Sequence, residues 1–374
     1  TVPAFATLNV PAVGALMAVT EYTSAAIRPG TAFGQPESGV RAAGPAFAGL
    51  DAFVLVDNAN AERFAPRDAT DAAITGAGSL KAAEVTALLR GALGVANRAR
   101  AQIRRPVGSA ARVTMSVVDT HGAILGIART RDAPVFGIDV SLQKARSAAF
   151  FSNPLAASDL SAAPDTEYLA NGEQVRFADY VSAYRSFVGR PTALADGAIA
   201  YSDRAIGNLA RPYFPDGLTT SSNGPLSKPI ERWSPFSTGL QLDLVNSAIV
   251  QHVVHVLGGG PDIGVGACTG MPATSSTPSR LANGLQIFAG AVPVYRSGIL
   301  VGALGISGDG IDQDDMIAFL GTHEGGLALG GAVGNAPPSI RSDVLEPQGV
   351  RLRYVQCPQA PYYASDEQNV CQGK

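Results

Sequence analysis

The chain contains four histidines, whose side chains suit metal coordination. His252 and His255 lie three residues apart, and on a helix this spacing places both on neighbouring rows of one surface. Such a pair could ligate a metal ion, or one imidazole could bind an iron centre axially. His323 follows an acidic segment and is a further candidate axial ligand. The alternatives are partly buried, hydrogen-bonded histidines for the pair and a helix-end cation for His323.

One short segment is crowded with carboxylates, namely Asp309, Asp312, Asp314 and Asp315. Oxygen ligands at such spacing suit calcium, and Asp309, Asp312 and Asp314 are its candidate ligands. The pattern differs from an EF-hand loop, which ends in a glutamate. Aspartates at a helix start also cap the helix and favour its dipole. A calcium site and a capped helix start therefore both stay open.

The three cysteines, Cys268, Cys357 and Cys371, form no CxxC or CxxCH motif, which disfavours a zinc ribbon and covalently attached haem. Three internal pairings are possible. Cys357–Cys371 is the favoured one, because it closes a short loop and would contribute about 3 kcal/mol. A disulfide fits an oxidising compartment, whereas three free thiols would fit the cytoplasm.

Catalytic motifs of the GxSxG, HExxH, P-loop or strand-linked GxGxxG type are absent, and no Ser-His-Asp set follows from spacing. The net charge of −3, from 28 basic and 31 acidic residues, argues against nucleic-acid binding. No run of about 18 apolar residues exists, so no membrane span is expected. Only 16% of residues are charged, and the 46% hydrophobic content is too high for disorder.

The elements that must position these side chains fall into two separated groups. Ser79 is a plausible N-cap of a helix that runs to about Arg105 and is stopped by Pro106. A β-hairpin over 112–129 comes next, and then a helix begins at Asp139 or Ser141 and ends near Phe151.

The second group comprises strands over 285–294 and 298–307 and a helix over 316–320. Residues 155–284 lie between the groups, are punctuated by Pro and Gly, and contain one clear helix at 241–257. Short strands are also predicted at 53–56 and 350–355. The aromatic residues of this intervening stretch could line a flat ligand or form its own small core; they are Tyr180, Tyr184, Phe187, Tyr213, Phe214, Trp233 and Phe236.

Both groups contain a series of short motifs. In the first group they are Val117-Val118-Asp119, Gly122, Arg129-Thr130-Arg131-Asp132-Ala133 and Ser141-x-x-Lys144-Ala145-Arg146-x-Ala148. In the second they are Gly290-Ala291-Val292-Pro293-Val294, Gly302-Ala303-Leu304-Gly305-Ile306-Ser307-Gly308 and Asp314-Asp315-Met316-Ile317-Ala318. Together these motifs resemble the GlcG/HbpS-like haem-binding family: the two halves match in order and cover residues 80–152 and 285–321.

The resemblance implies an α/β (α+β) domain with one mainly antiparallel sheet of about five strands and helices on its faces. It also implies oligomers and non-covalent binding of haem b. Lys144 and Arg146 lie on the helix that the family shares, where they could hold a haem propionate by charge-assisted bonds. The alternative for both is a solvated helix face.

The resemblance divides the chain into five parts: an arm (1–78), two halves of a core (79–154 and 285–322), a loop-rich insertion (155–284) and an extension (323–374). The insertion is expected to pack on the parent sheet, because its one strong helix cannot enclose a core alone. The chain starts at Thr1 and not at Met, which favours a processed periplasmic or secreted protein.

Three functions stand as hypotheses. The first is an exported, oligomeric haem-binding or haem-sensing protein without a defined reaction. The second is a structural or accessory subunit whose arm and insertion contact other copies or a protein partner, since interfaces tolerate few charges. The third is an enzyme acting on a small metabolite or on haem, for which the sequence supplies no catalytic set.

Overall fold

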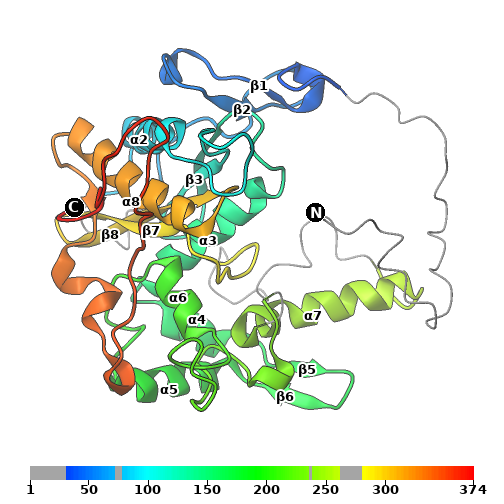
Figure 1. Cartoon of the computed structure of the whole chain (residues 1–374). Helices are drawn as coiled ribbons and strands as arrows, with labels where there is room; N and C mark the ends of the chain where they lie inside the picture. The colour runs from blue at the N-terminus through cyan, green and yellow to red at the C-terminus, as the bar shows by residue number, and fades with distance from the viewer. Residues whose placement is uncertain (1–30, 72–77, 236–237, 262–279) are drawn as a thin grey trace, which may run out of the picture. The chain divides into compact units, whose positions relative to one another are not determined.

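The computed structural model describes residues 31–71, 78–235, 238–261 and 280–374. Within them, seven strands form an antiparallel sheet in the order β1-β2-β4-β3-β8-β7-β9 (Figure 1). The strands are β1 (Val40–Ala42), β2 (Phe53–Leu55), β3 (Thr114–Val118), β4 (Ile124–Arg129), β7 (Ala291–Arg296), β8 (Ile299–Ser307) and β9 (Gly334–Asn335). The mixed α/β fold expected from the sequence is confirmed, with a wider sheet than the five strands expected.

The two sequence groups meet at the centre of this sheet. β3 and β4 form one hairpin and β7 and β8 another. β3 pairs with β8 in antiparallel register, with Thr114 opposite Ser307 and Val118 opposite Ala303. Segments separated by the whole insertion are therefore direct neighbours. The open ends of the two hairpins consequently lie at the same end of the strands.

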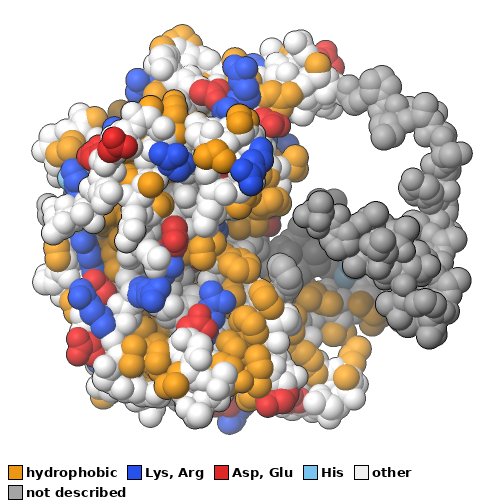
Figure 2. All heavy atoms as spheres, viewed as in Figure 1, with side chains coloured by type: hydrophobic (Ala, Val, Ile, Leu, Met, Phe, Trp, Pro, Cys, Tyr) orange, Lys and Arg blue, Asp and Glu red, His pale blue; other side chains and the backbone are white. Residues whose placement is uncertain are grey.

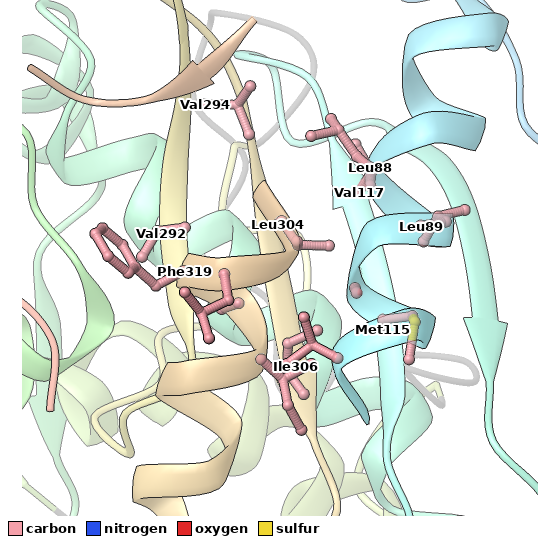
Figure 3. Close-up of a cluster of buried hydrophobic side chains, with 14 of the residues drawn as sticks. Leu88, Leu89, Met115, Val117, Val292, Val294, Leu304, Ile306 and Phe319 are labelled. Atoms are coloured by element: carbon pink, nitrogen blue, oxygen red, sulfur yellow. The ribbon is translucent and has the colours of Figure 1, made fainter. Parts of the chain in front are cut away.

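Helices cover both faces of the sheet. α2 (Ala82–Arg98) and α8 (Ile311–Ala328) lie on one face, and α3 (Gly137–Phe151) lies on the other. Strand residues alternate between these faces: Met115 and Val117 belong to the α2/α8 core, whereas the Ser116 hydroxyl lies 2.7 Å from that of Ser141 on α3. Figure 3 shows side chains of α2, α8 and the central strands meeting in that core.

Close helix packing explains why α8 is much longer than the predicted 316–320. A Cβ on Gly91 of α2 would lie 2.4 Å from the backbone oxygen of Gly321, and one on Gly325 would lie 2.8 Å from the Cα of Leu88. Tertiary contact thus keeps a glycine-rich sequence helical against its propensity. His323 consequently lies inside α8 and does not follow it.

The predicted helix over 79–105 is shorter in the structure. α2 starts after Lys81 and ends at Arg98, because Ala99 and Arg100 form β-bridges with Tyr362 and Ala110. The strand expected over 350–355 is absent: those residues form no strand, although Leu352 and Tyr354 are buried.

The insertion contains more structure than the one helix predicted from its sequence. Its described elements are α4 (Ala156–Ala162), α5 (Phe177–Val188), α6 (Asp203–Leu209) and α7 (Gly239–Val256), with a hairpin of β5 (Thr166–Tyr168) and β6 (Glu173–Val175). The seven-residue helices α4 and α6 are too short to show a clear periodicity. Tyr184, Phe214 and other aromatic side chains pack with Phe150 and Phe151 of α3 in a second core. Phe236 lies outside the described residues.

Short 3₁₀ turns fill much of the remaining chain, at Pro36–Ser38, Pro45–Phe47, Ile230–Arg232, Pro338–Ile340, Ser342–Val344 and Pro347–Gly349. Cys357 and Cys371 form a disulfide with Cα atoms 6.4 Å apart, whereas Cys268 lies outside the described residues. In the part of the chain that the structure describes, no helix is long and apolar enough to cross a membrane. Residues 1–30 and 72–77 of the arm also lie outside that part.

Candidate functional site

A cavity of about 400 Å³ opens beside α3, α8 and the start of α7. This size falls within the range of small-molecule sites. Most of its wall is apolar, and it includes a lysine and an aspartate that are almost fully buried. The described lining consists of Phe136, Val140, Lys144, Pro235, Gln241, Gln286, Phe288, Ser307, Asp309, Ile311 and Asp314. It therefore joins both halves of the sheet domain and the insertion.

The charged pair in the cavity consists of two residues that the sequence had assigned to different sites. Lys144 Nζ of α3 lies 2.8 Å from Asp314 Oδ2 in the first turn of α8 and donates to the Ile306 carbonyl at 2.9 Å. Both side chains are only 2% exposed. The two helices approach from opposite faces of the sheet, so the pair forms only where β8 ends.

Gly290 makes room for this pair. A Cβ at this position would lie 2.8 Å from Lys144 Nζ and 2.8 Å from the Cβ of Asp314, and its φ of +141° also disfavours a side chain. The glycine that begins the second motif therefore has a physical role. It lets the lysine reach the aspartate over the end of the sheet.

Burial has the largest effect on the pKa of Asp314. Desolvation raises the pKa of Asp314 to about 6, although the neighbouring Lys144 ammonium works in the opposite direction. Its carboxyl group therefore changes protonation near neutral pH, where most aspartates stay ionised.

A second buried acid, Asp203, lies close enough to interact electrostatically with Lys144 and Asp315. It is fully buried at the start of α6, and neither carboxyl oxygen has a hydrogen-bond partner among the described residues. Burial raises the pKa of Asp203 well above its usual value. Asp315, by contrast, contacts Arg204 and accepts from the Gln356 backbone N–H at 2.9 Å. Because Asp203 is buried and has no comparable partner among the described residues, its neutral, protonated form is favoured.

Arg146 does not line the cavity, although it lies on the same helix as Lys144. Its guanidinium donates to the Gly122 carbonyl at 2.8 Å and to Asn283 Oδ1 at 2.6 Å, and it is buried. Neither basic residue forms the solvated helix face that was the alternative. Arg146 joins the β3–β4 turn to the chain that returns from the insertion.

The three candidate calcium ligands make contacts with three different parts of the chain. Asp309 accepts from the backbone N–H groups of Gln102 and Ile103, Asp312 pairs with Arg204 at 2.6 Å, and Asp314 pairs with Lys144. Among the described residues, no group of three or more His, Cys, Asp or Glu side chains is arranged to hold a metal ion. Nor does an aspartate side chain cap α8, whose N-cap is Gly310.

The candidate histidines lie away from the cavity. His252 and His255 are in the C-terminal half of α7 with ring centroids 6.3 Å apart, and His255 Nδ1 lies 2.9 Å from the Gly260 carbonyl. His323, in α8, is half-buried, and its burial lowers the pKa of the imidazole. None of the three is among the described lining residues.

Several residues that line the cavity could not be recognised as site residues from the sequence. Phe136 is an exposed aromatic residue in the turn before α3, and Gln241 and Phe288 come from the insertion and its exit. The unpartnered Asp203 was also missed, because its burial depends on packing between segments far apart in the chain.

No family model matches the chain, and no curated protein sequence matches it. Among solved structures, it is similar to a PduOC–haem complex, with 16% identity over 66% of this chain and 94% of that chain, at a TM-score of 0.26. It is also similar to the Klebsiella pneumoniae protein ORFY, described as DUF336, with 17% identity over 57% of this chain and 75% of that chain, at a TM-score of 0.22. Similarity at this level assigns no ligand to the cavity, whose chemistry is set by its own residues.

Proposed function

We propose that the chain binds a flat, largely apolar organic acid in the cavity above Lys144 and Asp314. Haem is the compound of this class that the sequence resemblance names. One observation carries the proposal: a buried ion pair belongs to the lining of a mostly apolar cavity of about 400 Å³. Apolar walls with a few convergent polar groups are typical of small-molecule sites.

Lys144 supplies the recognition of an acidic group. Its contacts with Asp314 and the Ile306 carbonyl use two of the three N–H donors, counted within the described residues. The third donor can bind a ligand carboxylate, and charge-assisted bonds of this kind are stronger than neutral ones. Because an ionised Asp314 repels a bound carboxylate, affinity should rise as the pH falls through about 6, where Asp314 takes up a proton.

The cavity suits the organic part of haem better than its iron. Phe136 and Phe288 can contact a flat ring, and Lys144 can bind a propionate. The described lining offers no His, Cys, Met or Tyr to coordinate iron. The proposal is therefore recognition through the porphyrin and its carboxylates. Iron coordination by His252, His255 or His323 is a separate proposal, which needs a second site.

Absorbance titration tests this function. Haem and metal-free protoporphyrin should both bind saturably, with Kd values within a few fold of each other, because iron makes no contact. Lys144→Met should weaken both by tenfold or more, whereas Lys81→Met, at a surface lysine paired with Asp68, should change neither. Absence of a saturable spectral change with either compound would overturn the proposal. Binding of haem alone, lost in a His252→Ala/His255→Ala variant, would favour the histidine site.

A second candidate function, an assembly subunit, is favoured by the end of α7. Five large apolar side chains there are exposed: Ile249, Val253, Val254, Val256 and Leu257. Exposed apolar clusters of this kind are typical of interaction surfaces. Light scattering should give a mass above the 38.3 kDa of one chain, and Val256→Glu should reduce it. A monomer at high concentration would contradict an oligomer.

Export to the periplasm or outside the cell is supported by the disulfide between Cys357 and Cys371. Alkylation of native protein before reduction should leave both thiols unlabelled. Labelling of both in freshly extracted protein would count against an oxidising location. Figure 2 shows basic and acidic side chains interspersed on the visible face, which is consistent with a role that does not involve nucleic acid.

A further inference from the structure

We propose that the Lys144–Asp314 pair catalyses proton transfer at the carbon next to the carbonyl group of a 2-oxo acid with an apolar tail. This rests on the proposed function, because it needs the cavity to bind an organic acid. It goes further by giving the same two side chains a reaction. The substrate class is set by the cavity, which pairs a cation with aromatic and aliphatic walls.

Asp314 has the geometry of a general base. Its Oδ2 atom accepts from Lys144 at 2.8 Å, but its Oδ1 atom accepts, among the described residues, only from the Asp309 backbone N–H at 3.4 Å. A bond of that length is weak, so the lone pairs of Oδ1 stay available for a substrate proton. The side chain lines the cavity although it is only 2% exposed, so a bound substrate would shield it from water.

Lys144 has the geometry to stabilise the negative charge that develops on the substrate. The third N–H of its ammonium group, which binds the ligand carboxylate, can be shared with the adjacent carbonyl oxygen of a 2-oxo acid. Ser307 belongs to the same lining, and its hydroxyl is a second potential donor. Lys144 is held in place by two contacts before substrate arrives, and Ser307 has its backbone fixed as the last residue of β8.

The reaction balances without a cofactor. The C–H bond next to the carbonyl breaks, its proton moves to Asp314 Oδ1, and its electron pair forms the C=C bond of an enolate. The enolate oxygen is held by Lys144 and Ser307. Return of the proton to carbon regenerates the oxo acid, and its delivery to oxygen gives the enol. Neither route oxidises or reduces the substrate.

Charged and titratable groups surround the Lys144–Asp314 pair. Asp203 from α6 and Asp315 from α8 both interact electrostatically with the Lys144 ammonium. Arg204 neutralises Asp315, and Asp309 faces Asp314 from the loop before α8. Because burial raises the pKa of Asp314 to about 6, the basic form is populated at neutral pH and remains a useful proton acceptor. The rate should therefore rise with pH through about 6.

Phenylpyruvate is a suitable probe, because it combines a 2-oxo acid with an aromatic tail. Loss of its methylene proton signals in D₂O, followed by NMR, measures the exchange. The full-length protein should accelerate exchange at least 100-fold over buffer containing the same protein after heat denaturation, about the size of general acid–base effects. Asp314→Asn and Lys144→Met should each lower this about 100-fold or more. Asp312→Asn, at an acid of the same helix turn outside the cavity lining, should retain at least half of it.

Binding of phenylpyruvate is measured separately by calorimetry, so that the two proposals can fail independently. Saturable binding without exchange would overturn the catalytic proposal and leave the binding function intact. If neither phenylpyruvate nor porphyrin binds, both proposals fall. Asp314→Glu provides a second variant should Asp314→Asn not fold: it keeps the charge but displaces the carboxylate, and exchange should drop about tenfold. Full activity in Asp314→Glu and Asp314→Asn together would show that another group removes the proton.

Discussion

Two buried aspartates, one in the insertion and one in the sheet domain, lie in opposite environments. Asp243 of α7 accepts from the Tyr168 hydroxyl at 2.5 Å and the Tyr180 hydroxyl at 2.6 Å, and Lys228 Nζ lies 3.2 Å away. Both of its oxygens are thus occupied by strong donors. Asp314 has one firm contact, with Lys144, and a second oxygen with only a long hydrogen bond.

This difference distinguishes a buried acid that stabilises the fold from one that can contact a ligand. A carboxylate whose two oxygens both accept from strong donors stabilises the groups around it and has little capacity left for a ligand. Cavity volume alone does not make this distinction: a hollow of about 440 Å³ lies beside Tyr180 and Lys228 and is larger than that at Asp314. Its charged side chains already pair with one another, Arg176 with Asp179 and Lys228 with Glu173. Spare hydrogen-bonding capacity therefore identifies the site better than size.

Asp243→Ala should cause the largest loss of stability. It leaves two phenol hydroxyls and the Lys228 ammonium without their shared acceptor, and breaking a buried pair typically costs about 3 to 5 kcal/mol. Chemical denaturation at pH 7 measures the change in the free energy of unfolding. Porphyrin affinity of the folded protein should stay unchanged, because Asp243 does not line the cavity. A loss below about 1 kcal/mol, the usual value of one hydrogen bond, would show that the contacts of Asp243 do not stabilise the fold.

Lys144→Met should cost somewhat less, about 2 to 4 kcal/mol at pH 7.5, because it leaves Asp314 buried without its cation. The loss depends on pH in a defined direction. Asp314 already has a pKa raised to about 6, and removal of the ammonium raises that pKa further. Below about pH 5 the acid is neutral in both proteins, so the difference in the free energy of unfolding should shrink. A loss that is constant from acidic to mildly alkaline pH would contradict a role for the ion pair.

Asp203→Asn should have a smaller effect, of opposite sign. Burial raises the pKa of Asp203, so the folded protein holds a proton that the unfolded chain releases near 3.8. Stability of the wild type should therefore fall as the pH rises above that value. The neutral amide removes this contribution and should flatten the pH dependence, with a gain of about 1 kcal/mol at pH 7. Asp312→Asn, at a partly exposed acid, is the control and should keep the wild-type slope.

The sequence predicted the helices and strands whose formation depends on local residue patterns. The β3–β4 hairpin, β8 and helix α3 lie within a few residues of their predicted places, and α3 carries Lys144, whereas β7 starts six residues after its predicted start at 285. Pairing of Lys144 with Asp314 could not be predicted, because it depends on the antiparallel register of β3 and β8 across the insertion. Asp243 was not singled out, since its partners Tyr168 and Tyr180 lie 75 and 63 residues away along the chain.

Tyr168→Phe should produce the smallest change. It removes one of the two phenol donors of Asp243 and leaves Tyr180 and Lys228 in place, so the loss should be about 1 kcal/mol, the usual value of one hydrogen bond. The phenyl ring keeps the packing, and denaturation at pH 7 measures the difference. In the double variant with Tyr180→Phe, the loss should exceed the sum of the single losses, because Asp243 then keeps only Lys228 of these three partners. Additive losses would mean that the two hydroxyls act independently, and that the acid tolerates a missing donor as Asp314 does.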